Sequence, residues 1–173
     1  HIYFYGVEKN WWSRSGPPDK MPEGEIGGPD SEVFYDFGIE HNKNYGDECH
    51  PNCDCGRFLE IGNSVFIKYQ KQNDGSLKEL AQKNVDFGGG LERLTAAVNN
   101  TSDVFQTDLY LPIIQKIEET AGKKYQDHKS KMQVIADHMK AASFLSADTV
   151  TPSNKEHGYI LRRLLRRSAV KMY

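Results

Sequence analysis

Three consecutive glycines, Gly88–Gly90, mark the point at which the hydrophobic periodicity of the chain changes. Before them, apolar and polar residues alternate from Leu59 to Gln70, which is the period of a strand with one buried face. After them, apolar residues recur at helical spacing, beginning with Leu91 and Leu94. The fold must therefore pass from a strand to a helix through a short glycine turn.

Turn sequences divide the first hundred residues into extended segments. Asn73–Gly75 provides the backbone freedom of a hairpin turn, and a second extended segment near Leu77–Leu80 leads towards Asn84–Phe87. This hairpin indicates an antiparallel sheet. A shorter strand is expected at Glu32–Tyr35. The apolar run Ile2–Tyr5 also indicates a strand, and because the chain opens inside it we expect a piece of a longer protein.

The residues after Asn100 show only helical periodicity. Three helices are expected, over Pro112–Ala121, Met132–Leu145 and Leu161–Met172, with Pro112 in a first turn and Gly122 after a last one. The fold class is therefore α+β, with a sheet-based part over residues 1–100 and a helical part over residues 101–173.

The charge of the chain is distributed unevenly. Residues 151–173 carry a net charge of +5 within a total of −2 for all 173 residues, so residues 1–150 carry −7. A basic end after an acidic body favours a polyanionic partner, although a solvated helix face would look the same. Nucleic acid is favoured over a membrane surface, because no strongly apolar face accompanies the basic residues. A membrane span is excluded separately, because no apolar run approaches the roughly 18 residues that it needs.

The segment Val85–Leu94 has the chemistry of a phosphate site. The glycines let a ligand approach the backbone, and Arg93 falls in the first turn of the following helix, beside exposed N–H groups. The spacing is not that of a Walker A loop. A tight turn followed by a surface arginine is the alternative.

This segment resembles the third signature motif of class II aminoacyl-tRNA synthetases, and further segments narrow the resemblance. In chain order they are Asn10–Trp12, Gly28–Asp36, Leu59–Phe66, Val134–His138, Ala147–Asp148, and Pro152–Asn154 with Gly158–Arg163. Together they are similar to the later half of the catalytic domain and the first tRNA-recognition helices of alanyl-tRNA synthetases. The first two class II motifs would then lie upstream of His1. Gly62 stands where that family usually has Trp, and the glycine run replaces a pattern that more often contains Thr and Met.

The resemblance implies ATP-dependent activation of alanine and transfer of the alanyl group to the 3′ end of tRNA(Ala), with Mg²⁺ neutralising pyrophosphate. Such a reaction needs positioning and charge stabilisation rather than a nucleophile, and no Ser/His/Asp or paired-carboxylate device is present. A cytoplasmic enzyme is expected. The alternative is a non-catalytic tRNA-binding or regulatory fragment.

Candidate ligand-binding residues follow from the same motifs. Asp86 would pair with the α-amino group of alanine, Gly88 would keep the pocket small, Trp12 would form a wall, and Asn63 is a polar residue on an apolar strand face that needs a hydrogen-bond partner. Each has a structural alternative, as a turn residue, a core residue or a cap. The ATP phosphates would meet Gly88, Gly89, Gly90 and Arg93.

The basic end supplies the candidate tRNA contacts. Helical spacing places four arginines within an arc of roughly 140°, opposite the leucine face of the last helix; they are Arg162, Arg163, Arg166 and Arg167. Asn154, in the loop before this helix, can donate and accept at a base edge in an RNA minor groove, and the resemblance makes it a candidate for reading the acceptor stem.

The three cysteines form one cluster, Cys49, Cys53 and Cys55, with His41 and His50 nearby. Three thiols and a histidine suit Zn²⁺, but the spacing is not the paired Cys-x2-Cys pattern and does not fix a fourth ligand. We therefore expect that these residues do not bind zinc. A zinc-stabilised interaction module is the remaining alternative function.

Overall fold

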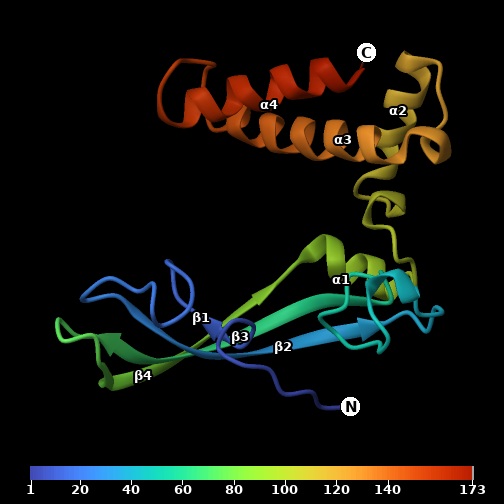
Figure 1. Cartoon of the computed structure of the whole chain (residues 1–173). Coiled ribbons are helices and arrows are strands. Elements are labelled where there is room, and N and C mark those ends of the chain that lie inside the picture. Colours follow the sequence, from blue (N-terminus) through green and yellow to red (C-terminus); the bar gives the residue numbers. More distant parts are fainter. Residues whose placement is uncertain (173) are drawn as a thin grey trace. The chain divides into compact units, whose positions relative to one another are not determined.

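The computed structural model describes residues 1–172 and divides into two compact units, one over His1–Ser102 and one beginning at Asp103 (Figure 1). The first unit contains the strands and one helix, and the second contains the remaining α-helices. The α+β class expected from the change in periodicity is confirmed.

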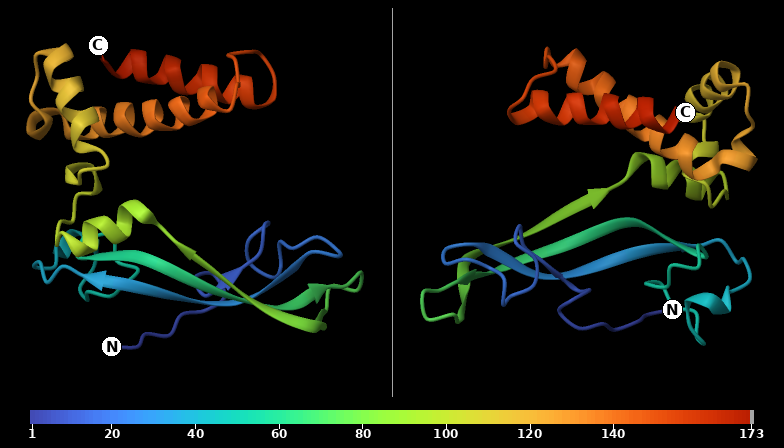
Figure 2. Two further views of the ribbon diagram at one scale, coloured as in Figure 1. Left: turned by 180° about the vertical axis from the view of Figure 1, so that it is seen from behind. Right: turned by 45° about the horizontal axis from the view of Figure 1, so that its top comes forward.

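The described part of the first unit is built on a four-stranded sheet in the order β1-β2-β3-β4. The strands are β1 (Trp11–Trp12), β2 (Ile26–Asp36), β3 (Phe58–Lys71) and β4 (Leu77–Gly89), and each neighbouring pair is antiparallel. The two further views in Figure 2 show β2, β3 and β4 as long, twisted neighbours. The antiparallel sheet predicted from the hairpin signals is confirmed.

The turn between β3 and β4 forms where the sequence predicts it. Gly75 has a φ of +83°, which glycine adopts without strain, and the Gln72 N–H donates to the Ser76 carbonyl at 2.9 Å. β2 is longer than the segment Glu32–Tyr35 expected from its composition, and β4 is one continuous strand.

The prediction of a strand at Ile2–Tyr5 is wrong. Residues 1–10 lie outside the sheet, and the side chains of Ile2 and Phe4 are 83% and 92% exposed. A local turn follows this segment: the N–H groups of Lys9 and Asn10 donate to the Gly6 carbonyl, and the Tyr5 N–H donates to the Asn10 side chain. An apolar run without a ladder partner does not form a strand.

Helix α1 (Leu91–Val98) begins directly after Gly90 and packs against β3. Its buried residues are the small Ala96 and Ala97, which allow a close approach, whereas Leu91 and Val98 are exposed. The glycine turn thus places the first turn of α1 at the end of the β3–β4 pair.

The second unit is helical. It contains α2 (Leu111–Ala121), α3 (Tyr125–Ala147) and α4 (Glu156–Met172), and α3 and α4 run side by side (Figures 1 and 2). A short 3-10 turn, η2 (Val104–Gln106), precedes α2, and Gly122 ends α2 with a φ of +63°. The three predicted helices are confirmed. The core between α2 and α3 contains Tyr110, Ile114, Ile117, Tyr125, Met132, Ile135 and Ala136, and the partly buried Met172 of α4 packs against it.

Gly62, the departure in the central strand, makes room for an aromatic ring from the neighbouring strand. A Cβ at position 62 would lie 2.9 Å from two ring carbons of Phe87, closer than side-chain carbons pack. Gly62 pairs with Gly89, two residues beyond Phe87 on β4. The bulk on this side of the β3–β4 pair therefore comes from Phe87, and a side chain at position 62 would have to displace the Phe87 ring.

We predict that Gly62→Ala lowers the free energy of unfolding by about 1 kcal/mol, because the new methyl group collides with the Phe87 ring. In a Phe87→Ala background the same substitution should be neutral or stabilising, since replacing glycine by alanine then only restricts the unfolded chain. Denaturant unfolding of the four proteins measures both effects. Gly88→Ala is the control, because a Cβ there meets nothing within 4 Å. Equal costs in both backgrounds would contradict the prediction.

Candidate functional site

The β3–β4 register brings three of the predicted pocket residues together. Asn63 pairs with Gly88, and Val65 pairs with Asp86. Directly opposed residues of an antiparallel pair project to the same side of the sheet, so Asn63 and Asp86 share a side with the open Cα of Gly88. These residues meet although they are far apart in the sequence.

Trp12 lies on the same side through the register of β2. It pairs with Gly28, and Gly28 is two residues before Asp30, which pairs with Val65. The irregularity between these pairs adds a residue to β3 and not to β2, so the alternation along β2 is kept. The Trp12 side chain is 40% exposed. Its position is compatible with the wall of an open pocket.

Asp30 is a site residue that the sequence analysis missed. The Asn63 Nδ2 donates to Asp30 Oδ2 at 2.9 Å, while Asp30 Oδ1 and Asn63 Oδ1 are buried without a hydrogen-bond partner among residues 1–172. Two buried acceptor oxygens without a donor are costly, and a cationic donor would satisfy both. Only the β2–β3 register reveals this pairing, because Asp30 and Asn63 are distant in sequence.

Arg93 is held at the start of α1 by the central strand. Its Nη1 donates to the Glu60 carbonyl at 3.1 Å and to Glu60 Oε2 at 2.6 Å. The Arg93 side chain is 47% exposed, so its guanidinium can also reach an anion in solvent. Gly90 caps α1 without a side chain, which leaves the backbone at the turn accessible.

Several carboxylates lie near Asn63, on or next to the side of the sheet that carries the predicted pocket residues. Burial and the neighbouring carboxylates of Glu60 and Asp30 raise the pKa of Glu32, which pairs with Asn63. A hollow of about 780 Å³ extends from here and is lined by Asp30, Glu32, Phe34, Arg57 and the first residues of the chain. The excess of negative charge favours a cationic ligand.

The arginine face predicted on the last helix is present on α4. Arg163, Arg166 and Arg167 are exposed, and the Arg162 guanidinium lies 5.7 Å from the centre of the Tyr159 ring. A shallow groove is lined by these four arginines with Tyr159 and Val170, whereas Leu161 is buried. One side of α4 therefore packs, and the other presents positive charge.

The loop that carries Asn154 is fixed by a close approach to α4. A Cβ at position 158 would lie 2.3 Å from Ser153 Oγ and 2.5 Å from the Thr151 carbonyl oxygen, so this approach requires Gly158. The Ser153 N–H donates to the Gly158 carbonyl at 3.0 Å. Asn154 itself is exposed between these anchored residues.

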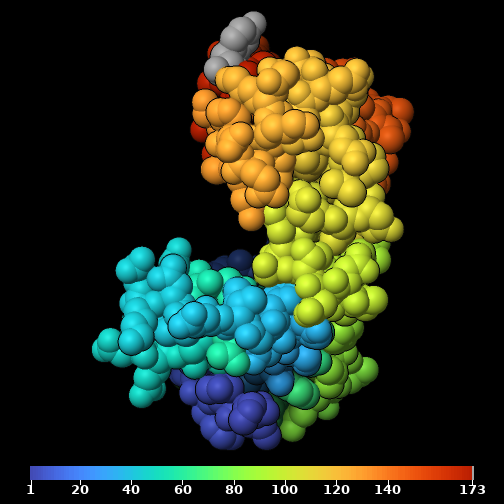
Figure 3. Space-filling model, turned by 90° about the vertical axis from the view of Figure 1, so that its right-hand side faces the viewer, coloured from blue at the N-terminus to red at the C-terminus, as the bar shows by residue number. Residues whose placement is uncertain are grey.

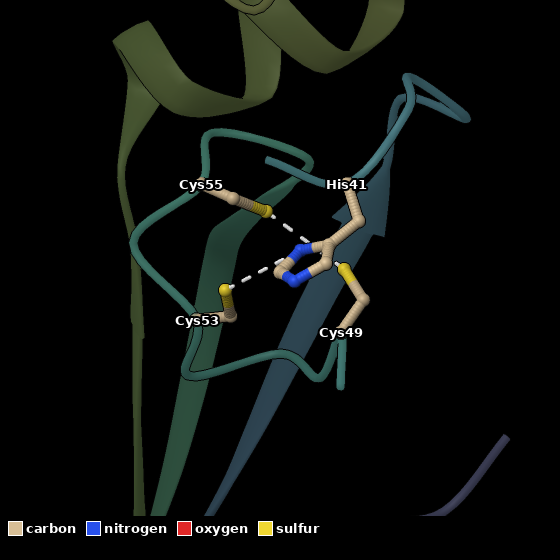
Figure 4. A group of neighbouring side chains, drawn as sticks. All are labelled: His41, Cys49, Cys53 and Cys55. Carbon is tan, nitrogen blue, oxygen red and sulfur yellow. Dashed lines mark hydrogen bonds between the residues drawn. The ribbon is translucent and has the colours of Figure 1, made fainter. Parts of the chain in front are cut away.

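The cysteine cluster gathers around His41 and not around His50 (Figure 4). The ligand atoms of His41, Cys49, Cys53 and Cys55 all lie within 4.8 Å of one another. Burial first of all raises the pKa of the Cys49 thiol. His50 instead contacts the Tyr5 hydroxyl through Nδ1 at 2.9 Å.

We predict that Glu32→Gln raises the midpoint of thermal unfolding at pH 7. Because the folded-state pKa of Glu32 lies above its ordinary value of 4.5, its ionised form costs stability above that pKa, and the cost disappears as the pH falls below 4.5. The gain should therefore vanish at about pH 4. Glu23→Gln, at an exposed position, is the control. A gain that is equal at both pH values would contradict this electrostatic origin.

None of the helices in the described residues 1–172 is long and apolar enough to cross a membrane.

Known proteins resemble the chain over nearly all of its length. Residues 1–173 match the family model described as class II (A) tRNA synthetases. The alanine–tRNA ligase of Petrotoga mobilis is 42% identical over 172 residues, which is 96% of this chain and 19% of that protein. The alanine–tRNA ligase of Endomicrobium trichonymphae is 47% identical over 148 residues, 84% of this chain and 17% of that protein.

A third relative, the alanine–tRNA ligase of Treponema denticola, is 41% identical over 174 residues, 96% of this chain and 27% of that protein. The chain thus spans 17% to 27% of the length of these curated relatives. Because the family model matches from the first residue to the last, the chain belongs to the class II (A) family of tRNA synthetases.

Proposed function

We propose that this chain supplies the amino-acid site and part of the nucleotide site of an alanine–tRNA ligase. Such an enzyme joins alanine to ATP as alanyl-adenylate and then transfers the alanyl group to the 3′ end of tRNA(Ala). The names of the relatives support the substrate, and the three free cysteines suit the reducing cytoplasm in which we place the enzyme. The observation that carries the proposal is the pair of unsatisfied acceptor oxygens on Asp30 and Asn63, beside Asp86 and Gly88.

The amino acid would bind on the side of the sheet that these residues share. Its ammonium group donates to the Asp86 carboxylate and satisfies the buried oxygens of Asn63 and Asp30. Gly88, with open space around its Cα, would leave room for the methyl group of alanine, and Trp12 would form a wall of the pocket. A pocket of this kind discriminates weakly against glycine and serine, because one methyl group is worth only about 1 kcal/mol and an added hydroxyl is poorly rejected.

ATP would bind at the junction of β4 and α1. Gly88, Gly89 and Gly90 would let its phosphates approach the backbone closely, and the guanidinium of Arg93 would contact them. Glu60 acts as a positioning residue, because it holds Arg93 at the end of β3 through two hydrogen bonds. The carboxylate of Glu32, whose pKa is raised by burial and by Glu60 and Asp30, is the oxygen donor that fits the Mg²⁺ ion of ATP.

The chemistry requires orientation more than proton transfer. The carboxylate of alanine attacks the α-phosphorus of ATP and pyrophosphate leaves; the terminal ribose hydroxyl of the tRNA then attacks the alanyl carbonyl and AMP leaves. A fixed ammonium group places the carboxylate for the first step, and the cationic groups at the turn stabilise the charge of the phosphates. Bound Mg²⁺ supplies further neutralisation of the pyrophosphate.

The tRNA would bind along α4. Arg162, Arg163, Arg166 and Arg167 present positive charge along one face, which suits the phosphates of a helical stem. Asn154, on the anchored loop before this helix, would read a base edge in the shallow minor groove of the acceptor stem. The affinity for tRNA and the discrimination between acceptor stems would thus come from different residues.

We predict that Asp86→Asn in the full-length protein lowers the rate of alanine-dependent pyrophosphate exchange at least 100-fold, mostly through a higher KM for alanine. The substitution removes the charge that pairs with the ammonium group, which is worth about 3 kcal/mol in a charge-assisted bond. Binding of tRNA should change little. Asp19→Asn, at an exposed position in the same unit, is the control. An unchanged KM for alanine in the Asp86 variant would remove this residue from the pocket.

We predict that Arg163→Gln changes the affinity for all tRNAs and its salt dependence, whereas Asn154→Ala changes the discrimination between tRNAs. Loss of one phosphate contact should weaken the binding of cognate and altered tRNAs alike and flatten the slope of log K against log salt by about one unit. Loss of the Asn154 amide should leave the slope unchanged and reduce discrimination between acceptor stems that differ at one pair by about 1–3 kcal/mol. Salt titrations with both tRNAs measure these effects, and Arg14→Gln is the charge control. Equal losses on both stems in the Asn154 variant would contradict the reading role.

A further inference from the structure

The connection between β2 and β3 is a long segment with little regular structure. Residues 37–57 contain one 3-10 turn, η1 (Lys43–Tyr45), and protrude from the sheet-based unit in the space-filling view (Figure 3, cyan). Asp36 and Arg57 close the base of this connection through two hydrogen bonds of 2.8 Å. Connections of this length are uncommon without structure of their own, so its outer part needs another source of order.

The four clustered side chains occupy the centre of this connection. Cys49 Sγ lies 3.8 Å from Cys55 Sγ, and Cys53 Sγ lies 3.9 Å from His41 Nδ1 (Figure 4). Tetrahedral zinc with Zn–S bonds of about 2.3 Å requires ligand atoms about 3.5–3.8 Å apart. The observed group, with all four atoms within 4.8 Å, therefore has nearly the size of a zinc coordination sphere.

The His41 ring is already oriented as a ligand. Its Nε2–H donates to the Gly46 carbonyl oxygen at 2.8 Å, which leaves the lone pair of Nδ1 facing the thiols. Gly46 has a φ of +120°, a backbone conformation that favours glycine. A second hydrogen-bond partner that fixes the tautomer is characteristic of histidines that bind metals.

The chemistry of the donors selects the ion. Three sulfurs and one imidazole nitrogen favour a soft or borderline metal such as zinc over Mg²⁺ or Ca²⁺, which prefer oxygen. A disulfide is the competing use of the thiols, but all three cysteines are free, and the distance of 3.8 Å between Cys49 and Cys55 is well beyond a bond of about 2.05 Å.

We propose that His41, Cys49, Cys53 and Cys55 bind one Zn²⁺ ion, through Nδ1 and the three Sγ atoms, and that this ion keeps the connection 37–57 folded. Binding displaces the thiol protons to solvent, and the metal–sulfur bonds replace a hydrophobic core that this segment lacks. Four protein ligands complete the tetrahedron, so the site is structural and leaves no position for substrate. The proposal does not depend on alanine or tRNA as substrates.

The experiment compares the zinc content of the full-length protein with that of variants, after extensive dialysis. Cys53→Ser and His41→Ala should each lose one zinc per chain relative to the parent. His50→Ala should retain it, because His50 contacts Tyr5 and not the cluster. His41→Cys should also retain it, since a fourth thiolate completes the same tetrahedron.

Two further measurements keep the test independent of enzyme activity. Cobalt added to the metal-free protein should give sulfur-to-metal charge-transfer absorption and the strong visible bands of a tetrahedral site, absent in Cys53→Ser and altered in His41→Cys. Hydrogen exchange should become faster in residues 37–57 on zinc removal, while β3 stays protected.

Equal zinc content in the parent and Cys53→Ser, with circular dichroism showing both folded, would overturn the proposal. A Cys49–Cys55 disulfide in zinc-free protein that is as protected from exchange as the parent would overturn it as well, because the thiols would then serve a redox role.

Discussion

The pairing of β3 with its two neighbours is the constraint on which the candidate site depends. β3 sets Asn63 opposite Glu32 on one side and opposite Gly88 on the other, and it sets Val65 opposite both Asp30 and Asp86. A slip of one residue would turn these side chains to the opposite face of the sheet. The predicted pocket residues can therefore contact a ligand together only when the strands pair in this register.

The same strand also connects this site to the nucleotide-binding turn. Glu60 belongs to β3 and holds Arg93 of α1, while Gly88 and Gly89 belong to β4 and are paired with β3. The rigid sheet thus carries the groups proposed for the amino acid, and the short helix carries the group proposed for phosphate. Such an arrangement positions two reactants with little dependence on flexible loops.

Periodicity was sufficient to predict the main elements but not the contacts between them. The alternation in β3, the hairpin at Gly75 and the end of α2 at Gly122 depend on nearby residues, so the sequence reveals them. Asp30 was not predicted as a site residue, because its place in the site depends on a hydrogen bond with Asn63 on another strand. Ile2–Tyr5 has the composition of a strand, but a strand forms only where a ladder partner is present, and composition does not show this.

The cysteine cluster illustrates the same limit. Its three thiols are obvious in the sequence, and His50 lies directly beside Cys49, whereas His41 is eight positions away. Spacing therefore leaves the fourth member undecided. The turn at η1 brings His41 back over the thiols, while the Tyr5 hydroxyl engages His50.

The contact of Gly62 with the Phe87 ring has a consequence for how such sequences diverge. Residues that share one volume across a strand pair are not free to vary independently, since a large side chain at one position requires a small one at the other. Related chains with a bulky residue at position 62 should carry a smaller one at position 87. The residues at these two positions should therefore be inherited together. A substitution that removes the Phe87 ring should arise before one that places a bulky side chain at position 62.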